Sequence, residues 1–574
     1  MTASKLRVAL GSLLALLAVL AAGKGLERQG VRFLERSLSK KLRVPVRVAA
    51  LGLRGGLAAR GVHIEDQQRG VVLALDRVAV GWNRIDIEGG DLTLEERALF
   101  GESRPQPPEE ASSGVRLPSF WSADVVRFER LSVSLVSPEG TRKLGTLRGE
   151  IARGEKGMSG HIVAGMESLE ADGSFSAVRG DSGEIHFETD LDLRALGLTW
   201  APVSRGPIHG NVRVELAGSW KDANLGVSRG RLRSAGAELE WSGNVALSGE
   251  GPVVDLNLSL ARTECQKVID AIPAGVMGEF SGFVLDGTLS GRARLQIAPE
   301  RPELTRFEVS VRDRCRFRKV PAAAALSRFR GPFTHRVVVN RGGAEGGIDE
   351  ALTFETGPTS PHWVPLANVS PFFLQAVLAQ EDAQFLTHAG FLPDAFETAL
   401  ARNLEEGRFA SGGSTISMQL ARNLFLVREK TLSRKVQELV LTWWLEKSLA
   451  KREIFELYVN LIEFGPGVYG IGPASEHYFG CAPSSLSPAE AAFLATVLPS
   501  PARRHRDYER GGLSSWSRAR VEQLLRRMWE RGRIDEEALF HGMAEVPWLT
   551  FHHGPVPRLR RHEDFGRAAL LPFS

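Results

Sequence analysis

The chain has 574 residues, of which 43% are hydrophobic and 24% charged, with 60 glycines and 29 prolines. This composition excludes a wholly disordered chain, a collagen-like repeat and a multi-span transporter. The length predicts three or four domains. With 72 Lys and Arg against 68 Asp and Glu, the net charge is only +4, so nothing in the total indicates a nucleic-acid partner, and any cationic function must be local.

Residues 1–24 are expected to form a membrane anchor or signal segment. Lys5 and Arg7 precede an apolar run over residues 8–23, which is shorter than the ~20 residues that usually span a bilayer. The anchor is favoured because Leu20 occupies the position two before Ala22, which makes a poor cleavage site. Positive charge before the run predicts a cytoplasmic N-terminus and places the rest of the chain outside the cytoplasm.

Apolar and polar residues alternate from about residue 44 to residue 297. This period of two predicts antiparallel strands with one solvated face. Residues 104–114 are rich in Pro, Glu and Ser and predict a linker. The sequence thus predicts a small β-rich domain (residues 25–103), a larger one (115–330) and a connector (331–360).

The β-rich region shows no paired acids, no histidine cluster and no phosphate-binding loop. Its first part contains the alternating segment 42–48, followed by the leucine- and glycine-rich segment 51–57. In this hydrophobic pattern, over about fifty residues, it resembles the start of AsmA-type envelope proteins, whose β-rich bodies lie beside bacterial membranes. A scaffold or spacer is the favoured interpretation, and a lipid-conducting groove is the alternative.

The three cysteines show no metal-binding spacing. Cys265 and Cys315 lie in the same middle region beside polar or charged residues, so a disulfide between them fits an oxidising compartment and leaves Cys481 as a free thiol. Three unrelated reduced cysteines are the alternative, because one sequence does not settle pairing.

After residue 361 the apolar period changes from two to 3.6. Ser370 and Pro371 predict a helix start, and Gly390 predicts its end. Glu381 lies within the apolar stripe of this predicted helix, where burial would raise its pKa and suit a general base. Asp382 and His388 are expected to support it, although both could be purely structural.

A second candidate element begins at two glycines, Gly412 and Gly413, and continues into a predicted helix. Such a helix start can hold an anion, although many similar loops only begin a helix. The polar residues that would cap this helix or line its first turns are Ser414, Thr415, Gln419, Arg422 and Asn423.

The third element places Arg434 and Lys435 four and three residues before Glu438. Both cations therefore share its helical face. An ordinary ion pair within a helix is the alternative, but the rest of the helix is so apolar that its charged face is expected to point into a cleft.

Five motifs in fixed order carry a more specific likeness. They lie at residues 381–390, 412–423, 434–438, 456–471 and 486–495. Together the motifs resemble those of the family 51 peptidoglycan glycosyltransferases, which polymerise lipid II in monofunctional transglycosylases and class A penicillin-binding proteins. The likeness spans about residues 364–506, roughly a quarter of the chain.

The resemblance implies a mainly helical, lysozyme-like glycosyltransferase domain over residues 361–545, followed by a basic tail (546–574). It also implies inverting transfer, with Glu381 as general base, Glu438 assisting at the donor site and Lys435 meeting the pyrophosphate. The remaining substrate-binding residues would be Arg434, Arg422, Lys430, Gln419, Asn423, Ser414 and Thr415. Arg422 and Lys430 exchange Lys and Arg relative to the family pattern but keep the charge.

No metal site or required cofactor is expected from the protein motifs, although a Mg or Mn ion could accompany the pyrophosphate. The expected partners are lipid II, the growing glycan strand, the bacterial inner membrane and envelope proteins that meet the β-rich region, with catalysis on the periplasmic side. A lysozyme-like glycan-cleaving enzyme and an inactive envelope scaffold are the alternatives. No K-T-G motif of a transpeptidase follows, and the segment from Ser514 to about Met543 predicts one basic amphipathic helix.

Overall fold

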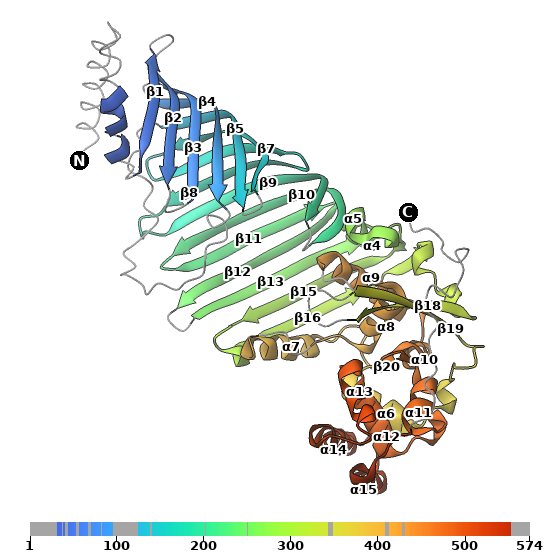
Figure 1. Ribbon diagram of the computed structural model, residues 1–574. Helices are drawn as coiled ribbons and strands as arrows, with labels where there is room; N and C mark the ends of the chain where they lie inside the picture. Colours follow the sequence, from blue (N-terminus) through green and yellow to red (C-terminus); the bar gives the residue numbers. More distant parts are fainter. Residues whose placement is uncertain are drawn as a thin grey trace.

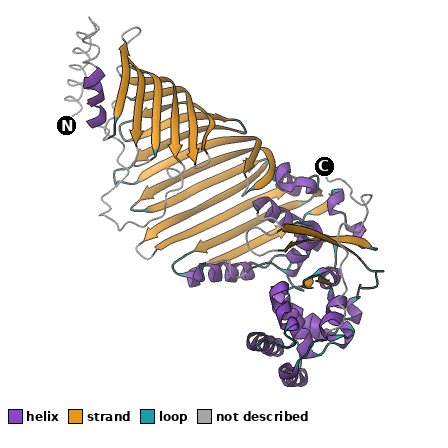
Figure 2. Ribbon diagram, in the orientation of Figure 1, coloured by secondary structure: helices purple, strands orange, loops and turns teal. Residues whose placement is uncertain are grey.

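A broad β-sheet and a helical lobe make up the computed structural model (Figures 1 and 2). It describes residues 31–36, 38–40, 44–52, 57–66, 70–81, 83–95, 124–137, 140–200, 203–248, 251–341, 348–407, 412–427 and 431–552. The expected anchor, the expected linker and most of the basic tail lie outside these residues. Within them, no helix combines the length and the apolar character needed to span a bilayer.

One 15-stranded sheet contains nearly all of the alternating sequence, and its strands follow chain order from β1 to β13 and then β15 and β16. The strands are β1 Val46–Gly52, β2 Leu57–Asp66, β3 Val71–Val80, β4 Arg84–Glu95, β5 Val125–Ser137, β6 Gly140–Arg153, β7 Gly157–Met166, β8 Leu169–Arg179, β9 Ile185–Trp200, β10 Ser204–Lys221, β11 Asn224–Ser234, β12 Ala237–Ser248, β13 Gly251–Glu264, β15 Thr288–Ile297 and β16 Arg306–Asp313. The period of two therefore identified these strands correctly.

The sheet crosses the point where the sequence analysis divides the β-rich region into two domains. Strands β4 and β5 flank the expected linker and pair directly, with Ile87 opposite Phe128. This pair is parallel, whereas the sequence analysis expected antiparallel strands throughout. The connection between them is long enough to return to the same end of the sheet, which is what a parallel pair requires. The two β-rich pieces therefore share one sheet.

Three left-handed residues form a crease across the first strands: Gly61 (φ 59°), Gly89 (φ 74°) and Arg130 (φ 53°). A side chain at Gly61 would come within 2.8 Å of the Ala49 Cβ, so this position requires glycine. A left-handed residue interrupts the alternation of side chains between faces. Apolar residues on both sides of the crease consequently join one cluster.

The helical lobe follows the sheet. Its helices are α6 Pro371–Glu381, α7 Pro393–Glu405, α8 Ile416–Phe425, α9 Leu432–Ser448, α10 Lys451–Leu461, α11 Ile471–Phe479, α12 Pro488–Val497, α13 Pro501–Glu509, α14 Ser515–Glu530 and α15 Glu536–Glu545, with a small hairpin of β20 Glu463–Gly465 and β21 Val468–Tyr469. Short elements link sheet and lobe: α4 Cys265–Asp270, α5 Ala274–Met277, β14 Val284–Asp286, β17 Arg316–Lys319, β18 Phe333–Arg341 and β19 Ile348–Thr356. Helix α12 is buried along its length and lies at the centre of the lobe.

The structure adds detail to one sequence expectation about this half of the chain and contradicts another. The connector at 331–360 is a hairpin, because β18 and β19 pair over nine residues each. The single basic helix expected after Ser514 is two helices, since Gly532 adopts φ 63° and the Asp535 side chain caps α15.

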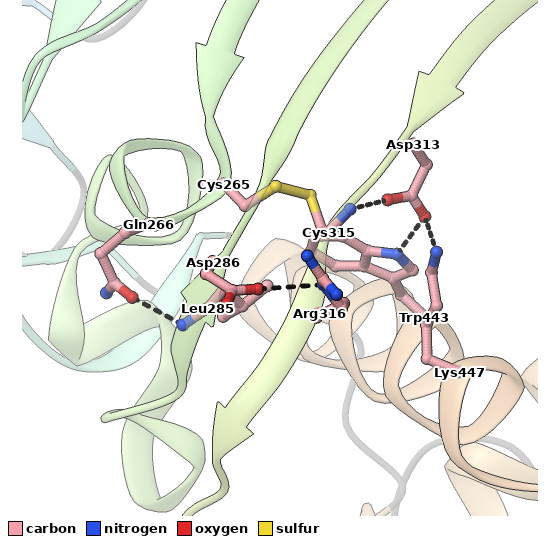
Figure 3. Close-up of a disulfide and its surroundings, with 9 residues drawn as sticks. All are labelled: Cys265, Gln266, Leu285, Asp286, Asp313, Cys315, Arg316, Trp443 and Lys447. Carbon is pink, nitrogen blue, oxygen red and sulfur yellow. Dashed lines mark hydrogen bonds and ion pairs between the residues drawn. A yellow bond between two sulfur atoms is a disulfide. The ribbon is translucent and has the colours of Figure 1, made fainter.

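The sheet and the lobe share one hydrophobic core. Cys265, Phe280 and Phe283, which follow the long strands, lie in the same buried cluster as Phe373 of α6 and Leu441 of α9. The buried Cys265 and Cys315 form a disulfide (Figure 3), which is one of the two possibilities that the sequence analysis left open. Cys481 is a free cysteine, as it also expected.

The disulfide closes a separation of 50 residues. Replacing both cysteines by serine is therefore expected to lower the free energy of unfolding by ~4 kcal/mol through loop-closure entropy. Chemical denaturation of the double variant and of the full chain measures the difference. Replacing Cys481 by serine is the control and should change stability by less than ~1 kcal/mol. Equal stability of the double variant and the parent chain would show that the pair adds nothing.

Candidate active site

Glu381 is the last residue of α6, and its surroundings favour the protonated form. Burial raises the pKa of its carboxyl group, while a hydrogen bond from Gln419 and the charge of Arg422 lower it in part. The Gln419 Nε2 donates to Glu381 Oε2 at 2.9 Å, and the Tyr458 hydroxyl donates to Gln419 Oε1 at 3.1 Å. One carboxylate oxygen is thereby held in place by a residue of α8, which is itself held by a residue of α10.

The helix that carries Glu381 is shorter than its sequence pattern predicts. It ends at Glu381 and does not continue to Gly390, because Asp382 adopts φ −160° and its side chain bonds to two other segments. Asp382 Oδ2 accepts from the Ile416 backbone N–H at 3.1 Å, and His388 Nε2 lies 2.9 Å from the same oxygen. Tertiary hydrogen bonds thus override the local helical pattern.

His388 fixes the loop after α6. Its Nδ1 accepts from the Gly390 N–H at 3.0 Å, so the Nε2 carries the proton that faces Asp382. Gly390 has φ 92°, and a Cβ there would come within 2.9 Å of Thr442 and Glu446 of α9. Asp382 and His388 therefore hold the backbone that follows Glu381, and their support of catalysis stays a prediction.

Backbone N–H groups at the start of α8 bind side chains of the protein itself. The Ile416 N–H binds the Asp382 carboxylate, and the Met418 N–H binds the Thr415 hydroxyl, which caps the helix. Of the two candidate caps in the sequence, Thr415 is the one whose side chain accepts this bond. Two of the N–H groups at this helix start are thus occupied within the protein, by the Asp382 carboxylate and the Thr415 hydroxyl, while binding of a ligand anion here stays a prediction.

A second charged group lies on α9. The Glu438 side chain is 1% exposed, and its two oxygens accept from Arg434 Nη1 and Lys435 Nζ, each at 2.8 Å. The Arg434 and Lys435 side chains are 22% and 42% exposed, so the carboxylate is buried beneath two cations that still reach solvent. The sequence spacing correctly predicted this shared face.

The opposite side of α9 rests on the β-rich region. Ser433 donates its N–H to the Val203 carbonyl at 2.8 Å, and Gln437 donates to the Val276 carbonyl at 2.8 Å. Trp444 donates its indole N–H to the Ala324 carbonyl at 3.0 Å. These contacts hold the helix that carries Arg434, Lys435 and Glu438.

Asp313, the last residue of β16, binds α9 near the disulfide (Figure 3). Its Oδ2 accepts from Trp443 Nε1 at 2.8 Å and from Lys447 Nζ at 2.9 Å, while its Oδ1 accepts from the Cys315 N–H at 2.8 Å. Burial works to raise the pKa of Asp313, but these hydrogen bonds outweigh it and leave the pKa below its usual value. No local sequence pattern indicates this contact, since Asp313 and Trp443 are 130 residues apart.

The sequence analysis also missed two other residues that hold the surroundings of Glu381, Tyr458 and Arg533. Tyr458 is fully buried, and burial raises its pKa well above the usual value, so it remains a hydrogen-bond donor toward Gln419. Arg533, which follows α14, donates to the Gln375 side chain at 3.0 Å and to the Ala383 carbonyl at 2.6 Å, which braces both flanks of Glu381. Arg533 lies 150 and 158 residues from its two partners, so no local pattern reveals it.

The remaining predicted residues are placed as follows. Ser414 and Asn423 are half-buried at the two ends of α8, and Arg422 lies on the same helix and acts electrostatically on Glu381. Lys430 lies outside the described residues. Ser417 of α8 bonds to Glu446 of α9, which ties the Glu381 and Glu438 groups together through their helices.

Replacing Asp382 by alanine is expected to lower the free energy of unfolding by ~1–3 kcal/mol, because the buried Ile416 N–H and His388 Nε2–H lose their acceptor. Thermal unfolding measures this loss. The matched control is Asp394→Ala, at an exposed position in the first turn of α7, which should change stability by ~0.5 kcal/mol or less. Equal effects of the two substitutions would contradict the role of Asp382.

A buried carboxyl group of raised pKa indicates a candidate acid–base site, and the two cations over a second carboxylate indicate a separate candidate site for an anion. Comparisons with known proteins agree. The family model described as Transglycosylase matches residues 349–529. A biosynthetic peptidoglycan transglycosylase of Nitrosospira multiformis is 45% identical over 166 residues, which is 29% of this chain and 70% of that protein.

Two further relatives carry the same name. The protein of Methylobacillus flagellatus is 43% identical over 29% of this chain and 72% of its own length. That of Nitrosomonas europaea is 51% identical over 24% of this chain and 57% of its own length. A crystal structure of penicillin-binding protein 1A from Haemophilus influenzae matches with a TM-score of 0.18 and 18% identity, over 36% of this chain and 20% of that one.

The chain belongs to the transglycosylase family, as the five motifs predicted. It is a peptidoglycan glycosyltransferase in which the matched domain follows a sheet that lies outside the family match.

Proposed function

We propose that this protein polymerises lipid II into peptidoglycan glycan strands by inverting glycosyl transfer. The observation that carries the proposal is the Glu381 carboxyl group, whose pKa burial raises and whose position Gln419 and Tyr458 hold. A carboxylate of raised pKa is a stronger base toward a sugar hydroxyl than an ordinary exposed one. The reaction also needs a place for the departing pyrophosphate, for which the cations Arg434 and Lys435 of α9 are the candidates.

The proposed reaction is a single displacement. Glu381 takes the proton from the 4-hydroxyl of the acceptor GlcNAc while that oxygen bonds to the anomeric carbon of the donor MurNAc. The bond from this carbon to the phosphate oxygen breaks, and the electron pair leaves with undecaprenyl pyrophosphate. One displacement inverts the anomeric configuration. Charge that develops on the leaving group is stabilised by fixed cations, for which Arg434 and Lys435 are the candidates.

Glu438 would orient these cations and would not transfer a proton itself. Both of its oxygens are engaged by Arg434 and Lys435, and it is nearly inaccessible to solvent. A cation tethered in this way loses little mobility when it binds a phosphate, so the pair is preorganised for the transition state. Arg422, on α8, is the candidate for a third positive charge near Glu381.

No cofactor is part of the proposal. Within the described part of the chain, no three His, Cys, Asp or Glu side chains are grouped to hold a metal ion. A Mg or Mn ion would therefore be carried by the pyrophosphate, where it would supply additional positive charge.

We also propose that residues 8–23 anchor the protein in the inner membrane with the transferase on the periplasmic side. A favourable observation is that the helical residues 31–36 and 38–40, which follow this run, pack Val31, Leu34 and Leu38 against the first strands of the sheet. Glu35 Oε1 also accepts from the Val48 N–H at 2.8 Å. The sheet would thus begin next to the membrane.

The proposed function is tested by incubating the purified full chain with labelled lipid II. Glycan polymer with release of undecaprenyl pyrophosphate is the expected result. Shortening of preformed glycan, without polymerisation, would instead identify a lysozyme-like enzyme. The absence of any turnover would identify a scaffold, and either of these two outcomes would overturn the proposal.

A further inference from the structure

One face of the 15-stranded sheet is apolar from the first strand to the last. Cross-strand neighbours on this face are apolar or glycine over most of the sheet. A row that illustrates this runs through Leu75, Gly90, Leu131, Leu147, Ala164 and Ala171, and a second through Leu191, Val214, Leu232, Leu239 and Leu260. Most of these side chains are only partly buried.

The opposite face carries charged side chains that pair with one another. Arg127 bonds to Glu150 at 2.7 Å, and Arg213 bonds to Asp190 at 2.5 Å. These pairs are exposed and contribute little to stability, but they mark this face as the one that faces water. The two faces therefore differ in what they can contact.

Glycines on the apolar face lie beneath aromatic side chains of the next strand. A Cβ at Gly160 would come within 2.8 Å of the Phe175 ring, and one at Gly218 within 2.7 Å of the Phe187 ring. The aromatic rings thus lie close to the backbone of the adjoining strand, where the glycines leave room for them. The result is an apolar surface without charged side chains at its centre.

The apolar face is covered at both ends by identifiable elements. At β1, Val31, Leu34 and Leu38 pack on Val46, Val48 and their neighbours of this face. At β16, the transferase lies on the same face, because Phe307 packs on Phe396 of α7 with ring centroids 4.8 Å apart, and Asp313 binds α9. Between these ends, the described strands β1–β9 and β11–β12 contact chiefly their neighbours in the sheet.

We propose that this face binds the polyprenyl chain of the lipid-linked sugar substrate, or of the pyrophosphate released from it, along the path between the membrane end and the transferase. This inference rests on the proposed function, which requires such a lipid. A large exposed apolar surface marks an interaction site. Continuity with the interface that carries α7 and α9 favours the substrate's own chain as the occupant.

The dimensions suit this role. Fifteen strands at ~4.8 Å spacing extend for about 67 Å, which is longer than the ~30 Å hydrocarbon core of a bilayer. The binding would be non-directional and independent of sequence, since apolar association scales with the area removed from water. A headgroup, in contrast, would find its charged partners only at the transferase end, at Arg434 and Lys435.

The test is photo-crosslinking of the full chain in detergent micelles with radiolabelled undecaprenyl pyrophosphate. A photoreactive phenylalanine analogue replaces Phe175 or Phe187 on the apolar face, and Val178 on the charged face serves as the matched control. The expected result is at least fivefold more label at the two phenylalanine positions. Equal labelling at Val178 would overturn the proposal, as would equal competition by phosphatidylglycerol or crosslinks mainly to a second copy of the chain.

A second comparison uses one added carboxylate on each face, in chains that carry the photoreactive analogue at Phe187. Leu191→Asp, on the apolar face, is expected to lower labelling at least fivefold, whereas Ser174→Asp, on the charged face, should leave it within twofold. Both variants should turn over a water-soluble, short-chain lipid II analogue at the parent rate. Unchanged labelling in Leu191→Asp would overturn the inference, while failure of the parent chain to turn over the analogue would instead count against the proposed function.

Discussion

Replacing Glu381 by glutamine is expected to reduce polymerisation of lipid II by a factor of about 10²–10⁴, the usual contribution of a general base. The amide keeps the shape of the side chain and can still bond to Gln419 Nε2 through its oxygen, but it cannot take up the acceptor proton. The measurement is the initial rate of polymer formation by the purified full chain. Glu405→Gln, at an exposed position on α7, is the control. A Glu381→Gln variant with a near-parental rate would remove Glu381 from the proposed role.

The same carboxyl group predicts the pH dependence of the rate. Because burial raises the pKa of Glu381 above its usual value, its basic form is lost at a higher pH than for an exposed glutamate. The rate should therefore fall as the pH is lowered through this raised pKa. Stability should change in the opposite sense, because a folded-state pKa above the unfolded one favours the folded protein while the group is protonated. That contribution is lost as the pH rises through the folded pKa, so Glu381→Gln should be no less stable than the parent chain at pH 7.

Replacing Phe317 by alanine is expected to lower both the stability and the activity of the transferase, although Phe317 belongs to β17, outside the family match. Its ring lies 5.1 Å from Trp443 and 5.0 Å from Trp444 of α9, and 5.4 Å from Phe283. Loss of these contacts from a partly buried position should lower the free energy of unfolding by about 2–4 kcal/mol. Movement of α9 should also raise the KM for lipid II several-fold, because Arg434 and Lys435 move with it.

Denaturation and steady-state kinetics of the full chain test this second expectation. Phe187→Ala is the control, since Phe187 is an aromatic residue of β9 in the 15-stranded sheet, whereas Phe317 belongs to the separate two-stranded sheet of β14 and β17. Kinetics with a short-chain lipid II analogue avoid any effect on polyprenyl binding. An unchanged KM in Phe317→Ala, with only stability reduced, would show that the β-rich region supports folding but does not position the donor site.

The sequence was sufficient for features that depend on local periodicity. Alternation identified the strands, and the spacing of Arg434, Lys435 and Glu438 predicted their shared face because residues three and four apart meet on any helix. The ordered motifs identified the family because they contain residues needed for the reaction as well as residues needed for the fold. Thr415 was one of two candidates for the cap of α8, and hydroxyl residues are common at such positions.

Features that depend on distant partners were not predictable. The end of α6 at Glu381 is set by the bonds of Asp382 to Ile416 and His388, whereas local propensity favoured a longer helix. The pairing of β4 with β5 depends on an open strand edge that no composition reveals, and a proline-rich segment between two strands says nothing about whether those strands meet. The contacts of Arg533 and Asp313 join segments more than a hundred residues apart.

Strand order in this sheet almost always follows chain order, and the edge strand β16 is covered by α7, whose Glu397 accepts from the Phe307 N–H at 2.6 Å. Each interior strand contacts chiefly the strands before and after it. Insertion or deletion of one hairpin between β5 and β13 would therefore leave the catalytic residues untouched and shift the distance between β1 and the transferase by about 10 Å. The sheet is therefore a spacer whose length can change in whole hairpins without altering the residues of the candidate active site.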